Sequence, residues 1–323
     1  MIIITERDKD SLVMQTEYIF TIIEMADTHT NKVIKDVNHI IAKAVKKNAR
    51  DLNASMIKPL TDDYPFSTNG IYFLCGKMGS GKSYTIMKHI LVTDKLFGQP
   101  YYDEVIFTST SGTLDKTVDT MKPLVKTPIT FVKDTDLMSY LERLIDKKME
   151  YYSIQKFIES GGTDVDDTMK HIIDTNHMWK VNKRGEKVID FKMVARYAIT
   201  KIQEYGFKHY PSYTLLVMDD FAGHPLLKDV NSPLAKMLTK TRHYHLTAVL
   251  AVQSWRFVNL NFKRLCSDII IWKGFSMQDF QRMIEQTPSN VDWKDLWQKY
   301  KDLPSNHSNL QINIAANKMS FNR

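Results

Sequence analysis

The chain is poor in cysteine and has no long apolar run. Its 323 residues include 2 cysteines, Cys75 and Cys266, and both lie in apolar sequence. Two such thiols are typical of small buried hydrophobes, which favours neither a disulfide framework nor a metal site and indicates a reducing, intracellular setting. No apolar run approaches the ~20 residues that a membrane span needs, and charged residues follow soon after the start. We therefore expect a soluble protein with no transmembrane segment and no signal peptide.

The charge of the chain is also modest. Its 44 basic and 37 acidic residues give a net charge of +7, so overall charge alone identifies no nucleic-acid partner. Hydrophobic residues make up 43% and charged residues 25%, as in an ordinary globular protein. The length allows one large domain or two small ones, each with a buried core.

Glycine is scarce, and its distribution is informative. Only 12 glycines occur, and Gly76, Gly79 and Gly81 fall within the stretch IYFLCGKMGSGKSYTIMKHIL, residues 71–91. The apolar start predicts a buried strand and the end an amphipathic helix, with the pattern G-x-x-x-x-G-K-[ST] between them. This strand–loop–helix context is what a phosphate-binding P-loop requires, because glycines let the backbone N–H groups turn towards an anion at the helix N-terminus.

The P-loop predicts how a nucleoside triphosphate, taken as ATP, would bind. Lys82 reaches the β- and γ-phosphates, and the Ser83 hydroxyl binds Mg²⁺. The residues expected around the phosphates are Gly76, Lys77, Met78, Gly79, Ser80, Gly81, Lys82, Ser83 and Tyr84.

A second motif is an apolar strand that ends in two carboxylates, YTLLVMDD at residues 213–220. Beside a P-loop, Asp219 is expected to hold Mg²⁺, and Asp220 to orient or deprotonate the attacking water. An acid in this second place indicates hydrolysis rather than transfer to a small-molecule acceptor. A further strand, Leu246–Val252, ends in Gln253, whose amide can sense the γ-phosphate or the lytic water.

Basic residues gather around this last strand. Between residues 228 and 264 there are seven of them against one acid, Asp229: Lys228, Lys236, Lys240, Arg242, Arg256, Lys263 and Arg264. They indicate either solvated surface charge or, as we favour, a surface that faces DNA phosphates or a neighbouring subunit's γ-phosphate.

The rest of the chain predicts flanking parts. Residues 1–66 are expected to form a helical appendage, and residues 67–323 the P-loop domain with a mostly helical insertion at about 150–211. His171 and His177 lie in that insertion near acidic residues, but their spacing matches no metal site. Further strands are expected at 104–108, 129–132 and 268–272, and helical patterns at 135–148, 152–159, 166–175, 191–205, 276–285, 291–300 and then 310–315.

The order of these motifs resembles the additional-strand class of P-loop proteins, and the run TKTRHYHLTAVLAVQSW (Thr239–Trp255) resembles the FtsK–HerA superfamily of DNA-pumping ATPases. The GKMGSGKS and VMDDF motifs look most like the genome-packaging ATPases of large DNA viruses, of the poxvirus type, and of virophages. The resemblance covers Ile71–Leu91 and Tyr213–Trp272. It implies an α/β, RecA-like fold with a mainly parallel sheet between helices.

The resemblance also implies roles and partners. Lys82, Ser83, Asp219, Asp220 and Gln253 would form the ATP and Mg²⁺ site, although relatives often carry glutamate at the position of Asp220. Arg242 would serve a neighbouring subunit as an arginine finger, with Arg256 and Arg264 as substitutes. Such proteins form rings, hexamers or pentamers, that thread double-stranded DNA. A capsid or membrane-vertex protein is a possible further partner, in the viral factory of the host cytoplasm or in the virion.

The leading interpretation is an ATP-hydrolysing motor that translocates viral double-stranded DNA into a capsid. A helicase or AAA-like remodeller is a second interpretation, and a nucleotide-gated virion assembly protein a third. A nucleotide kinase fits least, because its lid is usually rich in arginine and the insertion contains only Arg184 and Arg196.

Overall fold

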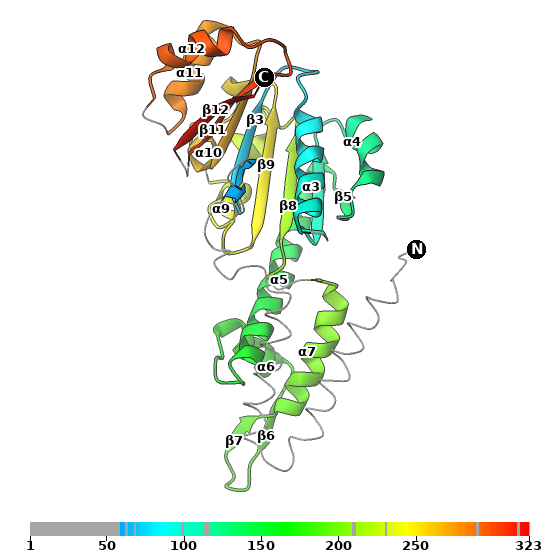
Figure 1. Cartoon of the computed structure of the whole chain (residues 1–323). Coiled ribbons are helices and arrows are strands. Elements are labelled where there is room, and N and C mark those ends of the chain that lie inside the picture. Colours follow the sequence, from blue (N-terminus) through cyan, green and yellow to red (C-terminus); the bar gives the residue numbers. More distant parts are fainter. Residues whose placement is uncertain are drawn as a thin grey trace. The chain divides into compact units, whose positions relative to one another are not determined.

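The structure is a computed structural model that describes most of the chain beyond residue 58 (Figure 1). The described residues are 59–61, 64–67, 69–97, 100–112, 116–208, 211–229, 231–288, 291–314 and 317–322. Most of the predicted helical appendage, residues 1–66, therefore lies outside the described residues. The end of that range is not helical: β1 (Pro59–Thr61) and β2 (Tyr64–Ser67) pair as antiparallel strands.

An 8-stranded sheet forms the centre of the P-loop domain, in the order β12-β11-β10-β3-β9-β8-β4-β5. The strands from β10 to β5 in this order run parallel, whereas β11 and β12 are antiparallel to their neighbours. Their bounds are β3 (Ile71–Cys75), β4 (Glu104–Ser109), β5 (Ile129–Phe131), β8 (Thr214–Asp219), β9 (Leu246–Val252), β10 (Asp268–Trp272), β11 (Asn309–Asn313) and β12 (Lys318–Asn322).

Strand β9 lies between β3 and β8, so one strand separates the P-loop strand from the acidic strand. This is the additional-strand arrangement of a RecA-like P-loop fold, and it confirms the predicted fold class. Every residue of β3 and β9 is buried, as parallel strands covered on both faces require. This burial on both faces explains why these strands are continuous apolar runs in the sequence.

Helices cover the sheet (Figure 1). The P-loop helix α3 (Lys82–Phe97) packs Ile86, Met87 and Ile90 against Tyr72 of β3 and Val249 of β9. The other helices of this part are α4 (Lys116–Met121), η2 (Lys122–Leu124), η3 (Asp134–Asp136), α8 (Pro225–Lys228), α9 (Pro233–Leu238), η4 (Trp255–Phe257), α10 (Leu260–Leu265), α11 (Met277–Gln286) and α12 (Trp293–Lys301).

One predicted element has the wrong type. Residues 310–315 were expected among the helical patterns, whereas the structure forms β11 (Asn309–Asn313) there. The burial of β11 alternates only weakly, because Asn309, Leu310, Ile312 and Asn313 are all buried. Asn309, Gln311 and Asn313 alternate with apolar Leu310 and Ile312, but this period of two extends over only 5 residues, so pairing with β10 and β12 decides the conformation.

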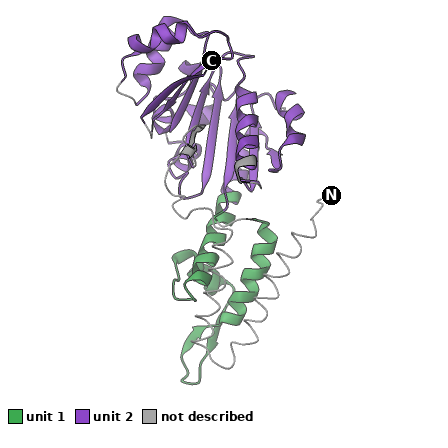
Figure 2. Cartoon of the chain, in the orientation of Figure 1, with its two compact units in different colours: residues 1–50, 144–211 green, residues 51–143, 212–323 purple. Residues whose placement is uncertain are grey.

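Residues 144–211 belong to a second compact unit, with its own core (Figure 2). It contains most of α5 (Leu137–Glu159), then α6 (Asp167–Thr175), the hairpin β6 (Trp179–Val181) and β7 (Lys187–Ile189), and α7 (Phe191–Tyr205). The side chains of Asp166 and Asp190 cap the N-termini of α6 and α7. The core of this unit is formed by Ile154, Phe157, Met169, Ile172, Ile173, Met178, Val194 and Ala198. Among the described residues, no helix is long and apolar enough to cross a membrane.

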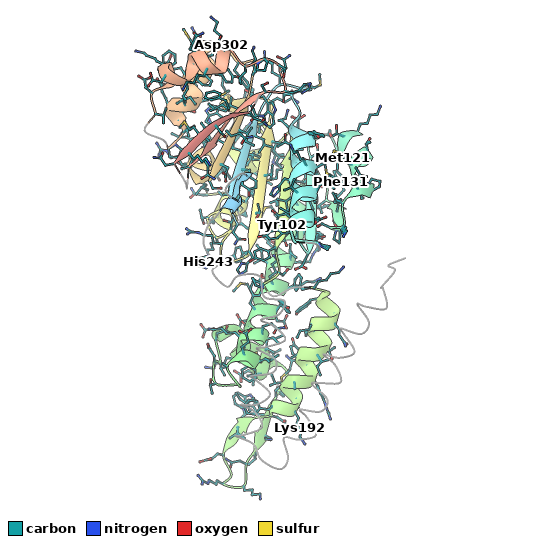
Figure 3. All side chains as sticks on the ribbon, viewed as in Figure 1. Tyr102, Met121, Phe131, Lys192, His243 and Asp302 are labelled. Carbon is teal, nitrogen blue, oxygen red and sulfur yellow. The ribbon has the colours of Figure 1, made fainter. Side chains whose placement is uncertain are left out.

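A buried carboxylate fixes the far end of the P-loop helix. Asp94 of α3 is 5% exposed and accepts hydrogen bonds from the backbone N–H groups of Tyr101, Lys126 and Thr127 and from the Thr127 hydroxyl. One side chain thereby ties α3 to the segments that enter β4 and β5. Beside it, Tyr102 (labelled in Figure 3) contacts buried His89 of α3 at 2.8 Å between the hydroxyl and Nε2.

We expect Asp94→Ala to lower the free energy of unfolding by about 3 kcal/mol, because it leaves several buried donors unsatisfied. Urea unfolding of the full chain measures this. Asp119→Ala, at an exposed position of α4, is the matched control and should change stability by less than about 0.5 kcal/mol. Equal effects of the two substitutions would contradict the anchoring role of Asp94.

Candidate nucleotide-binding site

The carboxyl ends of β3, β8 and β9 meet at one edge of the sheet. Because the strands are parallel and in register, Cys75 pairs with Val252, and Asp219 with Ala251. The P-loop, the two aspartates and Gln253 follow directly after these residues. A cavity of about 970 Å³ opens there, and Gly79, Lys82, Ser83, Asp219, Asp220 and Gln253 are among the residues that line it.

The conformation of the P-loop depends on its glycines. Gly79 and Gly81 have φ values of 73° and 102°, which glycine adopts without strain. Gly76 has a different role: its N–H donates to Val252 O at 3.1 Å, and an added Cβ would lie 2.4 Å from Ser80 Oγ and 3.1 Å from Trp272 Cβ. The loop is therefore joined to β9 and packed closely over β10.

Lys82 is folded back into the loop. Its side chain is buried, and Nζ donates to Gly76 O at 2.8 Å and to Lys77 O at 3.3 Å. The ammonium group thus lies within the concave side of the loop, where phosphate oxygens would replace these carbonyls. Met78 and Tyr84, also predicted to surround the phosphates, are 85% and 54% exposed and line the cavity.

Ser83 and Asp219 provide a suitable pair of ligands for Mg²⁺. Both side chains are partly exposed, and both line the cavity. A hydroxyl and a carboxylate are the hard oxygen donors that Mg²⁺ prefers, with the remaining positions filled by water and phosphate oxygens. The donor chemistry therefore fits the ion that the P-loop implies.

Asp220 and Gln253 contact each other directly. Gln253 Nε2 donates to Asp220 Oδ1 at 2.8 Å and to Oδ2 at 2.9 Å. Asp220 has φ = 57°, in the left-handed region that costs a non-glycine residue energy, and its N–H donates to Ala251 O at 3.0 Å. The chain turns sharply after β8, and this turn directs the second carboxylate towards the end of β9.

The predicted arginine finger lies elsewhere. Arg242 is exposed in the turn before β9, at the opposite edge of the sheet from the cavity. Its neighbour His243 is labelled at that lower edge in Figure 3, whereas Asp302, which ends α12, lies at the upper edge. β9 has 7 residues and so separates the two edges by about 20 Å. Arg242 therefore does not belong to its own chain's cavity.

The two substitute arginines are placed differently. Arg256, in η4, follows Gln253 closely, and its guanidinium binds Asp279 of α11 at 2.7 Å. Hydrogen bonds from Arg256 and Ser276 lower the pKa of Asp279. Arg264 is exposed near the end of α10.

The basic stretch between residues 228 and 264 does not form one surface. Lys236, Lys240 and Arg242 precede β9, whereas Arg256 follows it. Lys263 is buried: its Nζ donates to Gln286 Oε1 at 3.0 Å and lies 4.8 Å from the Trp255 ring centroid. Burial lowers the pKa of Lys263 to about 8.

Sequence reasoning missed a second wall of the cavity. Residues of β11, β12 and the loop before them contribute to it: His307, Asn309, Gln311, Ser320, Phe321 and Asn322. The only sequence signal is the alternation of polar and apolar residues in NLQIN and KMSFN, which a hairpin would produce. Without the pairing partner, that signal does not indicate where the polar face lies.

We expect Gly76→Ala to weaken nucleotide binding about tenfold or more, because the new methyl group forces Ser80 or Trp272 to move beneath the loop. Equilibrium titration with a fluorescent ATP analogue measures this. Gly112→Ala is the control: Gly112 has φ = 71°, but no atom lies within 4 Å of an added Cβ, and the residue lies outside the cavity lining. Unchanged affinity of Gly76→Ala would contradict the close packing.

No family model matches the sequence, and no curated protein matches it. Among solved structures, the chain is similar to the genome packaging NTPase B204 from Sulfolobus turreted icosahedral virus 2 in complex with ATP-gammaS. The sequence identity is 14%, the TM-score 0.42, and the match covers 79% of this chain and 96% of that chain.

A second similar structure is the cytoplasmic domain of the Thermomonospora curvata type VII secretion ATPase EccC, with 14% identity and a TM-score of 0.43 over 79% of this chain and 25% of that chain. A third is the pCW3 conjugation coupling protein TcpA, with 14% identity and a TM-score of 0.39 over 82% and 64% of the two chains.

Proposed function

We propose that the protein is an Mg²⁺-dependent ATPase motor that translocates double-stranded DNA and packages a viral genome into a capsid. The observation that carries the proposal is the convergence of Lys82, Ser83, Asp219, Asp220 and Gln253 on one cavity at the carboxyl ends of adjacent strands. These are the groups that hydrolysis of a phosphoanhydride requires, and each has a position that suits its role.

In the proposed mechanism, the protein positions ATP and neutralises its charge. The N–H groups of the P-loop and the Lys82 ammonium bind the phosphates, and Asp220 orients a water molecule in line with the γ-phosphate. Ser83 and Asp219 would hold Mg²⁺, which supplies further neutralisation of phosphate charge when it is bound. Gln253 would sense the presence of the γ-phosphate or the water.

The contact between Gln253 and Asp220 supports tight control of this activity. Both oxygens of the Asp220 carboxylate accept hydrogen bonds from the same amide, so the group that should orient water is already engaged. Turnover requires Gln253 to move away. Low basal hydrolysis, raised by a partner that shifts the end of β9, follows from this geometry.

The contact between Gln253 and Asp220 also supports one alternative function, a nucleotide-gated assembly protein. If no partner releases Asp220, the protein would bind ATP and hydrolyse it slowly, which suits a nucleotide-gated assembly protein. A helicase or remodeller would use the same site and differ in its action on DNA. Strand separation distinguishes a helicase from a double-strand translocase.

Among the described residues, the hairpin β6–β7 of the second unit has a surface that suits DNA binding. Lys180, Lys183, Arg184 and Lys187 are exposed there, and the one acid among them, Glu186, accepts a hydrogen bond from Asn182 Nδ2 at 2.8 Å. Exposed cations on a short hairpin can bind phosphates without reading the base sequence, as a translocating protein requires.

A ring of subunits, hexameric or pentameric, would complete the site. Arg242 is exposed and lies about 20 Å from its own cavity, so it could reach a γ-phosphate only in a neighbouring subunit. A guanidinium supplied in trans would link hydrolysis to the subunit interface. A capsid or membrane-vertex protein would dock this ring, in the viral factory of the host cytoplasm or in the virion.

The first experiment measures steady-state ATP hydrolysis with and without long double-stranded DNA at low salt. We expect DNA to raise turnover at least tenfold, and Lys82→Ala and Asp220→Asn to abolish it. Lys183→Glu with Arg184→Glu should keep the basal rate but lose the stimulation, because the hairpin no longer attracts phosphates.

The charge-matched control is Lys299→Glu with Lys301→Glu, at two exposed cations of α12. It should leave the stimulation unchanged. If DNA leaves the turnover of the unaltered protein unchanged, the motor proposal fails and the nucleotide-gated alternative stands. If both charge reversals remove the stimulation equally, DNA binding does not depend on the hairpin.

A second experiment tests the trans arginine by mixing inactive variants. Arg242→Ala and Lys82→Ala should each be inactive alone, but a mixture should recover part of the DNA-stimulated activity, because some interfaces pair an intact P-loop with an intact Arg242. A mixture of Lys82→Ala and Asp220→Asn should recover none, since both lesions affect the same chain's site. Full activity of Arg242→Ala alone would contradict the assignment.

A further inference from the structure

The nucleotide cavity has a polar wall that phosphate binding does not use. Asn309 of β11 pairs with Trp272 of β10 and with Asn322 of β12, and Gln311 pairs with Ser320. Cross-strand partners point to the same face of a sheet, and so do residues two apart. We call Asn309, Gln311, Ser320 and Asn322 the polar wall; all of them line the cavity.

The polar wall continues the face of the sheet that carries α3. Tyr72, Val249 and Trp272 on that face pack in the apolar core with α3. Beyond Trp272 the same face changes from apolar to polar side chains. Across the cavity lie Tyr84 and Lys88, which are separated by one turn of α3. Tyr84 contributes an aromatic side chain to the α3 side of this space, whereas Phe321 pairs with Leu310 and belongs to the other face of the sheet.

One hydrogen-bond acceptor in this wall is left without a partner. Asn309 is 3% exposed, and its Oδ1 accepts no hydrogen bond from any residue that the structure describes. Its Nδ2 donates to His307 O at 3.5 Å, which assigns the amide nitrogen to the protein and leaves the oxygen for another donor. A buried acceptor without a donor is costly, so its presence in a binding cavity indicates a ligand that supplies the donor.

The wall is connected to the phosphate-binding loop. His307 Nδ1 donates to Ser80 O at 3.3 Å, which joins the segment before β11 to the P-loop. Lys82, Asp219 and Gln253 line the part of the cavity where the phosphates of a nucleotide would bind. The base of the same nucleotide must therefore lie elsewhere in the cavity, and the polar wall is the part that offers hydrogen bonds to a base edge.

We propose that the polar wall is the nucleobase subsite and that Asn309 selects a purine with an amino group at position 6. This rests on the proposed function in that it takes the P-loop to bind a nucleoside triphosphate. Asn309 Oδ1 accepts from the exocyclic amino group of adenine, and the base lies between Tyr84 and the wall. A 6-oxo purine places a carbonyl oxygen against Oδ1, which leaves both acceptors without a donor.

The test is equilibrium binding of ATP, ITP and GTP to the full chain in the presence of Mg²⁺. Inosine differs from adenosine in carrying the 6-oxo group and a protonated ring nitrogen in place of the 6-amino group. We expect ATP to bind at least about tenfold more tightly than ITP or GTP. Asn309→Leu should weaken ATP about tenfold, leave ITP and GTP unchanged or tighter, and so remove the preference.

Asn261→Leu, at an exposed position of α10 outside the cavity, is the matched control and should keep the preference. The comparison of nucleotides on the unaltered protein depends on no variant, so a folding defect in Asn309→Leu leaves the test intact. Equal binding of ATP, ITP and GTP to the unaltered protein overturns the proposal, as does a preference for ATP that survives in folded Asn309→Leu.

The same binding experiment gives a different result if the proposed function itself is wrong. If none of the three nucleotides binds, or if Lys82→Ala binds them as tightly as the unaltered protein, the P-loop site itself is wrong. If binding requires Lys82 but ignores the base, only the role of Asn309 is wrong.

Discussion

The pairing of β9 with both β3 and β8 is the constraint on which the site depends. Backbone hydrogen bonds from Gly76 to Val252 and from Asp220 to Ala251 join the P-loop and the acidic turn to the end of the same strand. A shift of β9 by one residue would break both of these hydrogen bonds and repack side chains that are buried on both faces of the sheet. The register that stabilises the core therefore also sets the distances between the functional groups.

The end of β9 joins several hydrogen-bonded contacts. Gln253 binds both carboxylate oxygens of Asp220, and Asp220 is held in a left-handed conformation. Directly after Gln253, η4 is joined to α11 twice, through Arg256 with Asp279 and through Trp255 with Gln286. These contacts connect α11 to the segment that directly follows Gln253.

The two compact units divide the proposed work. The sheet supplies nucleotide chemistry from residues that come after its strands, and the second unit has its own apolar core and a hairpin with exposed cations. A separate core lets the insertion keep its fold independently of changes in the nucleotide site. The C-terminal hairpin β11–β12 adds a third contribution, because it extends the sheet and completes the cavity with polar side chains.

Local sequence patterns were enough to predict the P-loop, the acidic strand, the strand that ends in Gln253 and the fold class. These signals are local: apolar runs fix buried parallel strands, and glycines at fixed spacing fix the loop. Such patterns did not predict the strand at Asn309–Asn313 or the burial of Lys263.

These features depend on long-range contacts, because each is set by what lies across the sheet rather than along the chain. A short stretch of alternating polar and apolar residues becomes a strand when β10 offers it hydrogen bonds, and a lysine is buried when Trp255 and Gln286 surround it. Local sequence specifies the chemistry of the loops at the carboxyl edge. Long-range strand pairing specifies which other side chains line the cavity beside these loops.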